Sequence, residues 1–310
     1  MSTSQDPPAF PAGVEVIERG WLSSNIVVCM GVKSTALVDS GYHTHSEQTV
    51  ELVRTALSGR PLDILVNTHL HSDHCGGNAA LQEAFSNLTT LIPPGKAPSV
   101  TEWDPIALTY QPTGQHCPRF TFDGALQPGT HLDLGDLPWQ VLGAPGHDPD
   151  AVILFEERSR TLISGDALWE NGFGVVFPEL EGDRAFDDVA ATLDIIEKLA
   201  PRVLVPGHGA VTAYDAALME RARRRLDSFV KDPERHARHA AKVLLKFRLL
   251  QVQADDWMTF KHWAMSTSYL ENIRVRFFAP ATASEFIELL TDELINVGAA
   301  RREANKIFNG

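Results

Sequence analysis

The stretch "VNTHLHSDHCGG", residues Val66–Gly77, places three of the chain's twelve histidines and one aspartate within six positions. The apolar "LDILVNTH" at its start is typical of a buried strand, and "GGNAALQEAF" at its end has helical spacing. His69 and His71 are two residues apart at the end of the strand, so their side chains project to the same side. Asp73 and His74 follow on the loop that starts the helix. Because a catalytic zinc prefers neutral imidazoles and carboxylates, the pattern predicts part of a metal site.

Three further segments place a residue of a metal-ligating type at the end of a predicted strand. They are "APGHDPD" with His147, "LISGDAL" with Asp166 and "LVPGHGAV" with His208. Taken alone, each is more often a capped loop or a hydrogen-bonded polar residue, and the first stretch by itself is also compatible with a histidine-rich surface turn. Four such segments in one chain favour a shared site at the ends of several strands.

The series H-x-H-x-D-H, then G-H, then G-D, then G-H resembles the metallo-β-lactamase fold hydrolases, whose order and approximate spacing these segments share. The resemblance covers roughly residues 14–213 and implies an α/β fold, the four-layer αββα sandwich, with metals at one edge of its paired sheets. It also implies two sets of metal ligands with a shared bridge. These are His69, His71 and His147 for one metal, Asp73, His74 and His208 for the other, and Asp166 between them.

Two Zn²⁺ ions at such a site define the expected chemistry, with iron or manganese as alternatives. A water shared between two cations loses a proton near neutral pH, which gives a bridging hydroxide aimed at a carbonyl or phosphoryl centre. The resemblance suggests that Asp73 is also catalytic, because it orients that hydroxide or relays its proton. We therefore expect a dinuclear zinc hydrolase that cleaves an ester, thioester or related carbonyl bond in a small molecule.

The segment "GDALWENGFGVVF" is most similar to the glyoxalase II branch, with the pattern G-D-x-L-F-x-x-G-x-G. Trp169 stands in its aromatic position, and Gly172 and Gly174 are retained. The lysine and tyrosine that help to hold glutathione in that branch correspond here to Val175 and Phe177, so glutathione itself is not the expected substrate.

Two further departures concern neighbouring branches. Trp169 also stands where the acyl-homoserine lactonases have a tyrosine, which argues against a lactonase of that type. The common G-H-T-x-x-H form of the third segment has a second histidine where this chain has Ala151, so a partner of the metal ligands is missing or replaced. Trp169, Phe173 and Phe177 are expected to form an apolar wall of the substrate pocket, with core packing as the alternative.

The chain's last third differs from the rest. Strand and helix patterns alternate up to residue 213, and almost everything after it has helical spacing. We therefore expect a catalytic domain at 1–213 and a small, mainly helical domain at 214–310, for which a winged-helix-like fold is left open. Residues 219–250 contain ten Lys and Arg against four Asp and Glu, although the whole chain has a net charge of −13.

This basic segment leaves a second class of function open, the β-lactamase-like endoribonucleases or phosphodiesterases, whose members include chains with a winged-helix-like tail. Such a basic run is more often a solvated helix face, whose positive charges here would balance the acidic remainder of the chain. The residues concerned are Arg221, Arg223, Arg224 and Arg225. An oxygen-using iron enzyme of the same fold is a third class, but it needs fewer ligands than the seven present here.

The composition and the N-terminal sequence predict where the protein is located and what it binds. The N-terminus "MSTSQDPPAFPAG" has no basic patch followed by an apolar run, and no stretch is apolar for long enough to cross a bilayer, so a cytoplasmic location is expected. Three cysteines without a C-x-x-C pair fit reduced thiols. The expected partner is a small-molecule substrate, not a membrane; nucleic acid is not favoured, and a homodimer is left open.

Overall fold

The computed structural model describes residues 10–310; residues 1–9, which begin the stretch expected to hold no secretory signal, lie outside the described part. The described chain divides into two units. The first comprises residues up to 104 and residues 117–227; the second comprises 105–116 and 228–310. The domain ranges 1–213 and 214–310 stay a prediction.

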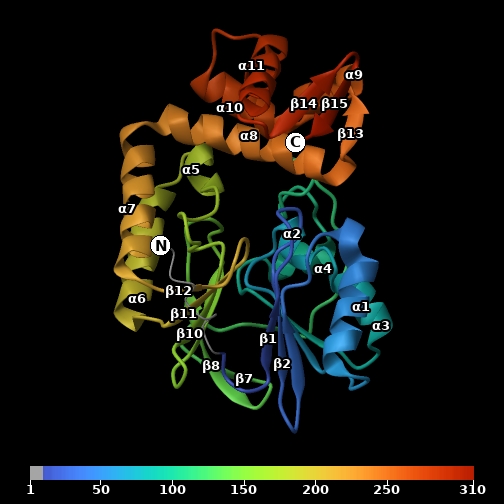
Figure 1. Cartoon of the computed structure of the whole chain (residues 1–310), viewed down its shortest axis with the longest axis vertical. Helices are drawn as coiled ribbons and strands as arrows, with labels where there is room; N and C mark the ends of the chain where they lie inside the picture. Colours follow the sequence, from blue (N-terminus) through green and yellow to red (C-terminus); the bar gives the residue numbers. More distant parts are fainter. Residues whose placement is uncertain (1–9) are drawn as a thin grey trace, which may run out of the picture. The chain divides into compact units, whose positions relative to one another are not determined.

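Two mixed six-stranded sheets form the centre of the first unit (Figure 1). The first sheet has the order β1-β2-β3-β4-β5-β6, with parallel pairing from β3 to β6. Its strands are β1 (Val14–Ile17), β2 (Ile26–Met30), β3 (Thr35–Val38), β4 (Ile64–Val66), β5 (Thr89–Ile92) and β6 (Gly124–Ala125). The second has the order β12-β11-β10-β9-β8-β7, and only β10 and β11 in it pair in parallel. Its strands are β7 (His131–Leu134), β8 (Leu137–Gly143), β9 (Val152–Glu156), β10 (Thr161–Gly165), β11 (Val203–Pro206) and β12 (Thr212–Ala213).

Apolar side chains on both faces of the sheets hold these layers together. In β2, Val27 and Cys29 face the core between the sheets, whereas Ile26 and Val28 face the cluster that contains helix residues. This is why the strand is an unbroken apolar run and does not alternate with polar residues. Both faces of the sheet are therefore covered.

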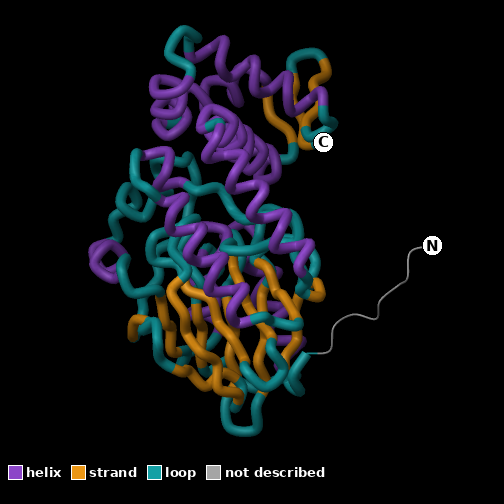
Figure 2. Tube along the Cα trace, turned by 90° about the vertical axis from the view of Figure 1, so that its left-hand side faces the viewer, coloured by secondary structure: helices purple, strands orange, loops and turns teal. Residues whose placement is uncertain are grey.

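Helices cover the two outer faces. Residues of α1 and α3 join the cluster on the outer face of the first sheet, and α6 contacts the end of β8, where Thr192 donates a hydrogen bond to the Pro145 carbonyl. The helices are η1 (His43–His45), α1 (Ser46–Leu57), α2 (Ser72–Cys75), α3 (Asn78–Ala84), α4 (Ala97–Glu102), α5 (Phe177–Glu181) and α6 (Ala185–Leu199). Helix α7 (Ala216–Lys231) runs from the first unit into the second. The strands lie between α6 on one side and α1 and α3 on the other (Figure 1), and the view turned by 90° shows them gathered in one part of the chain (Figure 2). The predicted αββα sandwich is confirmed.

The second unit is mainly helical, as predicted, but it also contains a small antiparallel sheet of order β13-β15-β14. Its helices are α8 (Pro233–Val252), α9 (Trp257–Ser266), α10 (Ser268–Phe277) and α11 (Ala283–Asn296); its strands are β13 (Ala254–Asp256), β14 (Ala300–Glu303) and β15 (Lys306–Asn309). These strands were not predicted. The turn between β14 and β15 contains Ala304 with a φ of 50° in place of the glycine that usually marks such a hairpin. Among residues 10–310, no helix is both long and apolar enough to span a bilayer.

Candidate metal centre

Seven predicted ligands meet at one edge of the two sheets. Four of them follow β4 of the first sheet, and the other three follow β8, β10 and β11 of the second. In chain order they are His69, His71, Asp73, His74, His147, Asp166 and His208. All but His71 and Asp73 are buried. Segments far apart in the chain thus supply one group of imidazoles and carboxylates.

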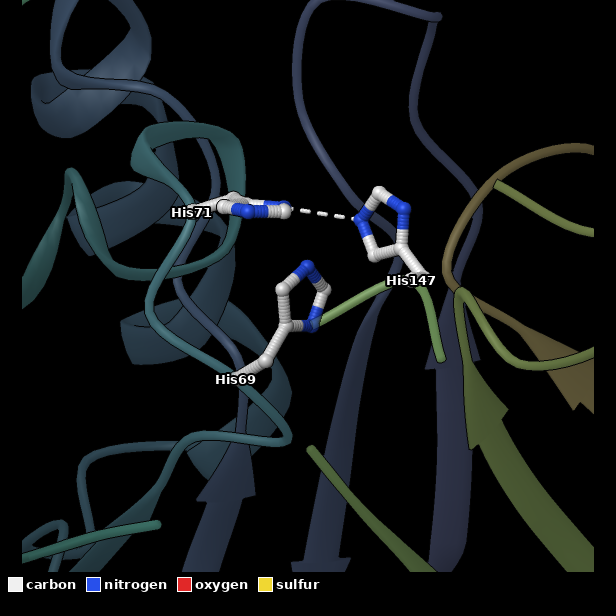
Figure 3. Close-up of side chains that lie close together, drawn as sticks. All are labelled: His69, His71 and His147. Carbon is white, nitrogen blue, oxygen red and sulfur yellow. Dashed lines mark hydrogen bonds between the residues drawn. The ribbon is translucent and has the colours of Figure 1, made fainter. Parts of the chain in front are cut away.

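The first group consists of His69, His71 and His147, whose ligand atoms all lie within 4.8 Å of one another (Figure 3). The Nδ1 atom of His71 lies 2.7 Å from Nε2 of His147, and the planes of the two rings are nearly perpendicular, at 89° (Figure 3). The carbonyl of Val175 accepts a hydrogen bond from Nδ1 of His147. This bond leaves Nε2 of His147 to present its lone pair to the site.

The second group consists of Asp73, His74 and His208. Asp73 Oδ2 lies 3.0 Å from His208 Nε2. Asp166 lies between the groups: its Oδ1 is 3.3 Å from His74 Nε2, and its Oδ2 is 3.4 Å from His147 Nε2 and 4.0 Å from His208 Nε2. One carboxylate therefore reaches histidines of both groups.

Burial and charge set the protonation of these side chains. Burial lowers the pKa of His71 and of His147 to about 4, which keeps both rings neutral. Burial alone would also lower the pKa of His74, but the Asp166 and Asp39 carboxylates raise that pKa well above its usual value. Burial likewise opposes ionisation of Asp166, yet the facing imidazoles hold its pKa well below the ordinary range. The site therefore combines neutral imidazoles at His71 and His147 with an ionised Asp166 and a protonated His74 beside it.

The donor set fits metal ions. His69 Nε2 is buried, and no hydrogen-bond partner reaches it among the described residues, although its Nδ1 lies 3.1 Å from the Thr68 hydroxyl. An orphaned imidazole nitrogen of this kind would be costly unless a further group bound it. Gly207 leaves space for two of the ligands, because a Cβ at this position would stand 2.2 Å from Asp166 Oδ1 and 2.7 Å from the His74 ring. The cluster can hold metal ions.

Comparison with known proteins agrees with this geometry. The model of the metallo-beta-lactamase superfamily matches residues 19–208. The chain belongs to that superfamily. It is 27% identical over 186 residues to the probable metallo-hydrolase YybB of Bacillus subtilis (59% of this chain, 79% of the relative), and 24% identical over 187 residues to the probable hydroxyacylglutathione hydrolase glo2 of Schizosaccharomyces pombe (59% and 62%).

Among solved structures, the chain is similar to TTHA1623 in a di-iron-bound form. The TM-score is 0.53 at 27% identity, over 64% of this chain and 94% of that one. As a member of the metallo-beta-lactamase superfamily with metallo-hydrolases among its relatives, the chain is a metal-dependent hydrolase. The resemblance stated from the sequence motifs is confirmed.

The metal centre of this chain has a supporting carboxylate, Asp39, that the sequence motifs did not reveal. Asp39 Oδ2 lies 2.8 Å from His74 Nδ1 and accepts a hydrogen bond of 2.8 Å from the Thr68 hydroxyl. Its other oxygen accepts from the Thr68 backbone N–H. Asp39 therefore holds His74 with Nε2 toward Asp166. A signal was available in the sequence, because Asp39 directly follows the apolar run of β3, just as Asp166 directly follows β10.

A second carboxylate stands beside the first group. Ala151 occupies the position where a second histidine was expected, and it makes no polar side-chain contact. Instead, Asp148 Oδ2 lies 3.8 Å from His71 Nε2, on the side of the ring away from His147. Burial raises the pKa of Asp148. At 3.8 Å the two side chains are too far apart for a hydrogen bond, but a buried carboxyl group lies next to the first ligand group.

Aromatic side chains flank both groups. Phe177 contacts the rings of His71 and His147, with centroids 5.4 and 5.8 Å away. Trp169 is half-buried and donates a hydrogen bond of 3.3 Å to Asp166 Oδ1. Phe173 is buried, with the Arg225 guanidinium 5.6 Å from its ring centre. Two of the three predicted wall residues thus lie against the ligands, and the third, Phe173, is buried and lines a small cavity together with His147 and Asp166.

Proposed function

We propose that the chain is a dinuclear zinc hydrolase that cleaves an ester, thioester or related carbonyl bond of a small molecule, with iron or manganese as alternative metals. The observation that supports it best is the position of Asp166 within 4.0 Å of histidines from both ligand groups. A bridging carboxylate is the natural means of holding two cations side by side. The di-iron form of TTHA1623 is a precedent for two metals and for iron.

The site residues have separate proposed roles. His69, His71 and His147 would hold one cation, and Asp73, His74 and His208 the other. When bound, the pair supplies a Lewis acid for the substrate oxygen and lowers the pKa of an attacking water. Asp73 is partly exposed, and only its Oδ2 faces His208, at 3.0 Å from Nε2, so its second oxygen can orient that water and take its proton.

An apolar acyl group is the proposed substrate feature. Val175 is buried and uses its carbonyl to hold His147, so its side chain offers nothing to a glutathione tripeptide. Phe177 presents a ring where a hydroxyl would be needed. A glutathione thioester carries two carboxylates and an ammonium, which require charged or hydroxyl partners. The name of the glo2 relative supports thioester chemistry for the branch, while these two residues favour a simpler thioester or ester here.

The basic run on α7 supports the small-molecule proposal over RNA cleavage. Arg223 contacts Asp194 and Glu197 of α6 at 2.8 and 2.7 Å, and Arg224 pairs with Glu220. Arg221 donates to the Glu170 carbonyl, and Arg225 covers Phe173. Each of these four arginines thus has a partner within the first unit. Carboxylates offset the charge of Arg223 and Arg224, which leaves less of the charge of this run to follow a phosphate backbone.

The decisive experiment combines metal analysis with a substrate panel of thioesters, lactones, phosphodiesters and single-stranded RNA. We expect about two metals per chain and turnover of simple thioesters or esters, and Asp166→Ala should lose metal and activity together. Asp183→Ala, on the exposed turn after α5, is the control. Unchanged metal content in Asp166→Ala contradicts the bridge. RNA cleavage with a steep salt dependence that Arg223→Gln flattens contradicts the substrate class.

A further inference from the structure

Trp21 is a large apolar side chain that the fold leaves open beside the metal centre. Its side chain is 57% exposed, and it lies on the loop between β1 and β2, in a stretch that no sequence motif marked. The indole stacks on the His208 ring with a centroid distance of 5.6 Å and an interplanar angle of 8°. Trp169 meets the same indole edge-on at 5.5 Å. One face of Trp21 therefore covers a metal ligand, and much of the indole remains open to solvent.

The loop that carries Trp21 is fixed to the two loops that carry the second ligand group. The Ser24 N–H donates to the Asp73 carbonyl at 2.9 Å, and the Asn25 N–H donates to the Gly207 carbonyl at 2.7 Å. The Asn25 side chain also donates to the carbonyls of Pro206 and Gly209. An exposed aromatic ring on a loop held in this way is preorganised to receive a ligand, because little conformational entropy is lost when the ligand binds.

The aromatic residues beside the metal centre form two walls, Phe177 on one side and Trp21 with Trp169 on the other, and each wall lies against a different ligand group. Phe177 contacts His71 and His147, whereas Trp21 and Trp169 both contact His208. A carbonyl that reacts between the groups has its two substituents directed away from each other. One wall can therefore contact the acyl side and the other the leaving-group side. The departing group must reach solvent, and Trp21 is the more exposed of the two walls.

We propose that Trp21 is a specificity-determining residue that contacts the leaving group of the substrate and selects an apolar or aromatic alcohol or thiol there, while Phe177 contacts the acyl group. The inference rests on the proposed ester or thioester hydrolysis, in which water adds to the carbonyl, the bond to sulfur or oxygen breaks, and an acid and a thiol or alcohol are released. A simple role in shielding His208 is the competing explanation.

Two thioester series test the assignment on the metal-loaded protein. The first keeps the acetyl group and changes the thiol from 2-mercaptoethanol to butanethiol to benzyl mercaptan; the second keeps 2-mercaptoethanol and lengthens the acyl chain. Wild type should prefer the benzyl thioester, and Trp21→Ala should reduce that preference roughly three- to tenfold, the range expected for one aromatic contact. Trp21→Phe should retain most of it, and Phe177→Ala should flatten the acyl series alone.

Three outcomes overturn the assignment: an equal loss by Trp21→Ala across all thiols, a change in the acyl series only, or reduced metal affinity without altered selectivity. Binding gives a readout independent of turnover. The affinity of a non-hydrolysable 2-phenylethyl ketone, the analogue of the benzyl thioester with CH₂ in place of sulfur, should fall in Trp21→Ala. It should not fall in Val32→Ala, at an exposed apolar residue on the β2–β3 turn. If the ketone binds in a Trp21-dependent way but no thioester is turned over, the proposed function is contradicted and the role of Trp21 in binding is supported. If the ketone binds wild type and Trp21→Ala equally well, the inference is contradicted.

Discussion

Replacing Asp39 by asparagine should weaken metal binding without touching any metal ligand. The change keeps the side-chain shape and the oxygen that accepts from the Thr68 N–H, and asparagine tolerates the φ of 60° at this position. It replaces Oδ2, the atom that faces both the Thr68 hydroxyl and His74 Nδ1 at 2.8 Å, by an NH₂ group. An NH₂ donor favours His74 with its proton on Nε2, the nitrogen that faces Asp166, so the lone pair needed by a metal is lost.

The expected size follows from those contacts. Loss of a hydrogen-bonded partner of a metal-ligating histidine costs about 10- to 100-fold in metal affinity, and loss of a hydrogen bond to a charged group costs about 1.5–3 kcal/mol in the free energy of unfolding. Metal affinity is measured by competition with a chromophoric chelator, and stability by urea unfolding of the metal-free protein. Asp63→Asn is the matched control, because Asp63 also accepts from a backbone N–H and a hydroxyl, both of Thr35, outside the ligand cluster. Wild-type metal affinity in Asp39→Asn, or an equal loss in Asp63→Asn, refutes the reasoning.

Two further predictions concern backbone clearance and charge. Gly207→Ala should displace the Asp166 carboxylate and lower the metal content per chain. Gly20→Ala is the control, because the space around its added Cβ is open. Metal analysis compares the two variants, and an equal metal content would contradict the predicted clash. Glu293 is partly buried, which would raise its pKa, but ion pairs to two basic residues of α8 lower it. Its contribution to stability should therefore be present above the unfolded pKa of about 4.3 and be lost as the pH falls through the lower folded value. Glu293→Gln should cost about 0.5–1 kcal/mol at pH 7 and less near pH 3 by urea unfolding, and a pH-independent difference would contradict this.

The ligand cluster could be predicted from sequence because each member follows a recognisable strand, and its residue type is chemically specific. His147 and Asp166 needed only the local pattern of an apolar run, a glycine and a polar residue. The αββα sandwich followed from the same alternation of strands and helices together with the family resemblance.

The supporting residues depend on pairing that no local pattern gives. Asp39 reaches Thr68 only because β3 and β4 lie side by side in parallel, and Trp21 reaches His208 across 187 positions of the chain. The arginines of α7 show the same limit in another way. Their composition suggested either a solvated face or a nucleic-acid surface, whereas Arg223 is paired with acidic residues of α6, whose register relative to α7 is set by packing.

Each ligand group takes side chains from both sheets, so metal binding should also hold the sandwich together. His69 and His71 follow a strand of the first sheet, and His147 follows a strand of the second. Asp73 and His208 likewise follow strands of different sheets. A ligand that binds only the folded state stabilises it by about 2.7 kcal/mol at 100 times its dissociation constant. Removal of metal with a chelator should therefore lower the unfolding temperature of the first unit, and metal should restore it. Asp39→Asn should need more metal for the same rise, since its defect lies in affinity. An unfolding temperature that does not respond to metal would mean that the hydrogen bonds between the two halves of the cluster already hold the edge of the sandwich, and that the ligands are not cross-linking the sheets.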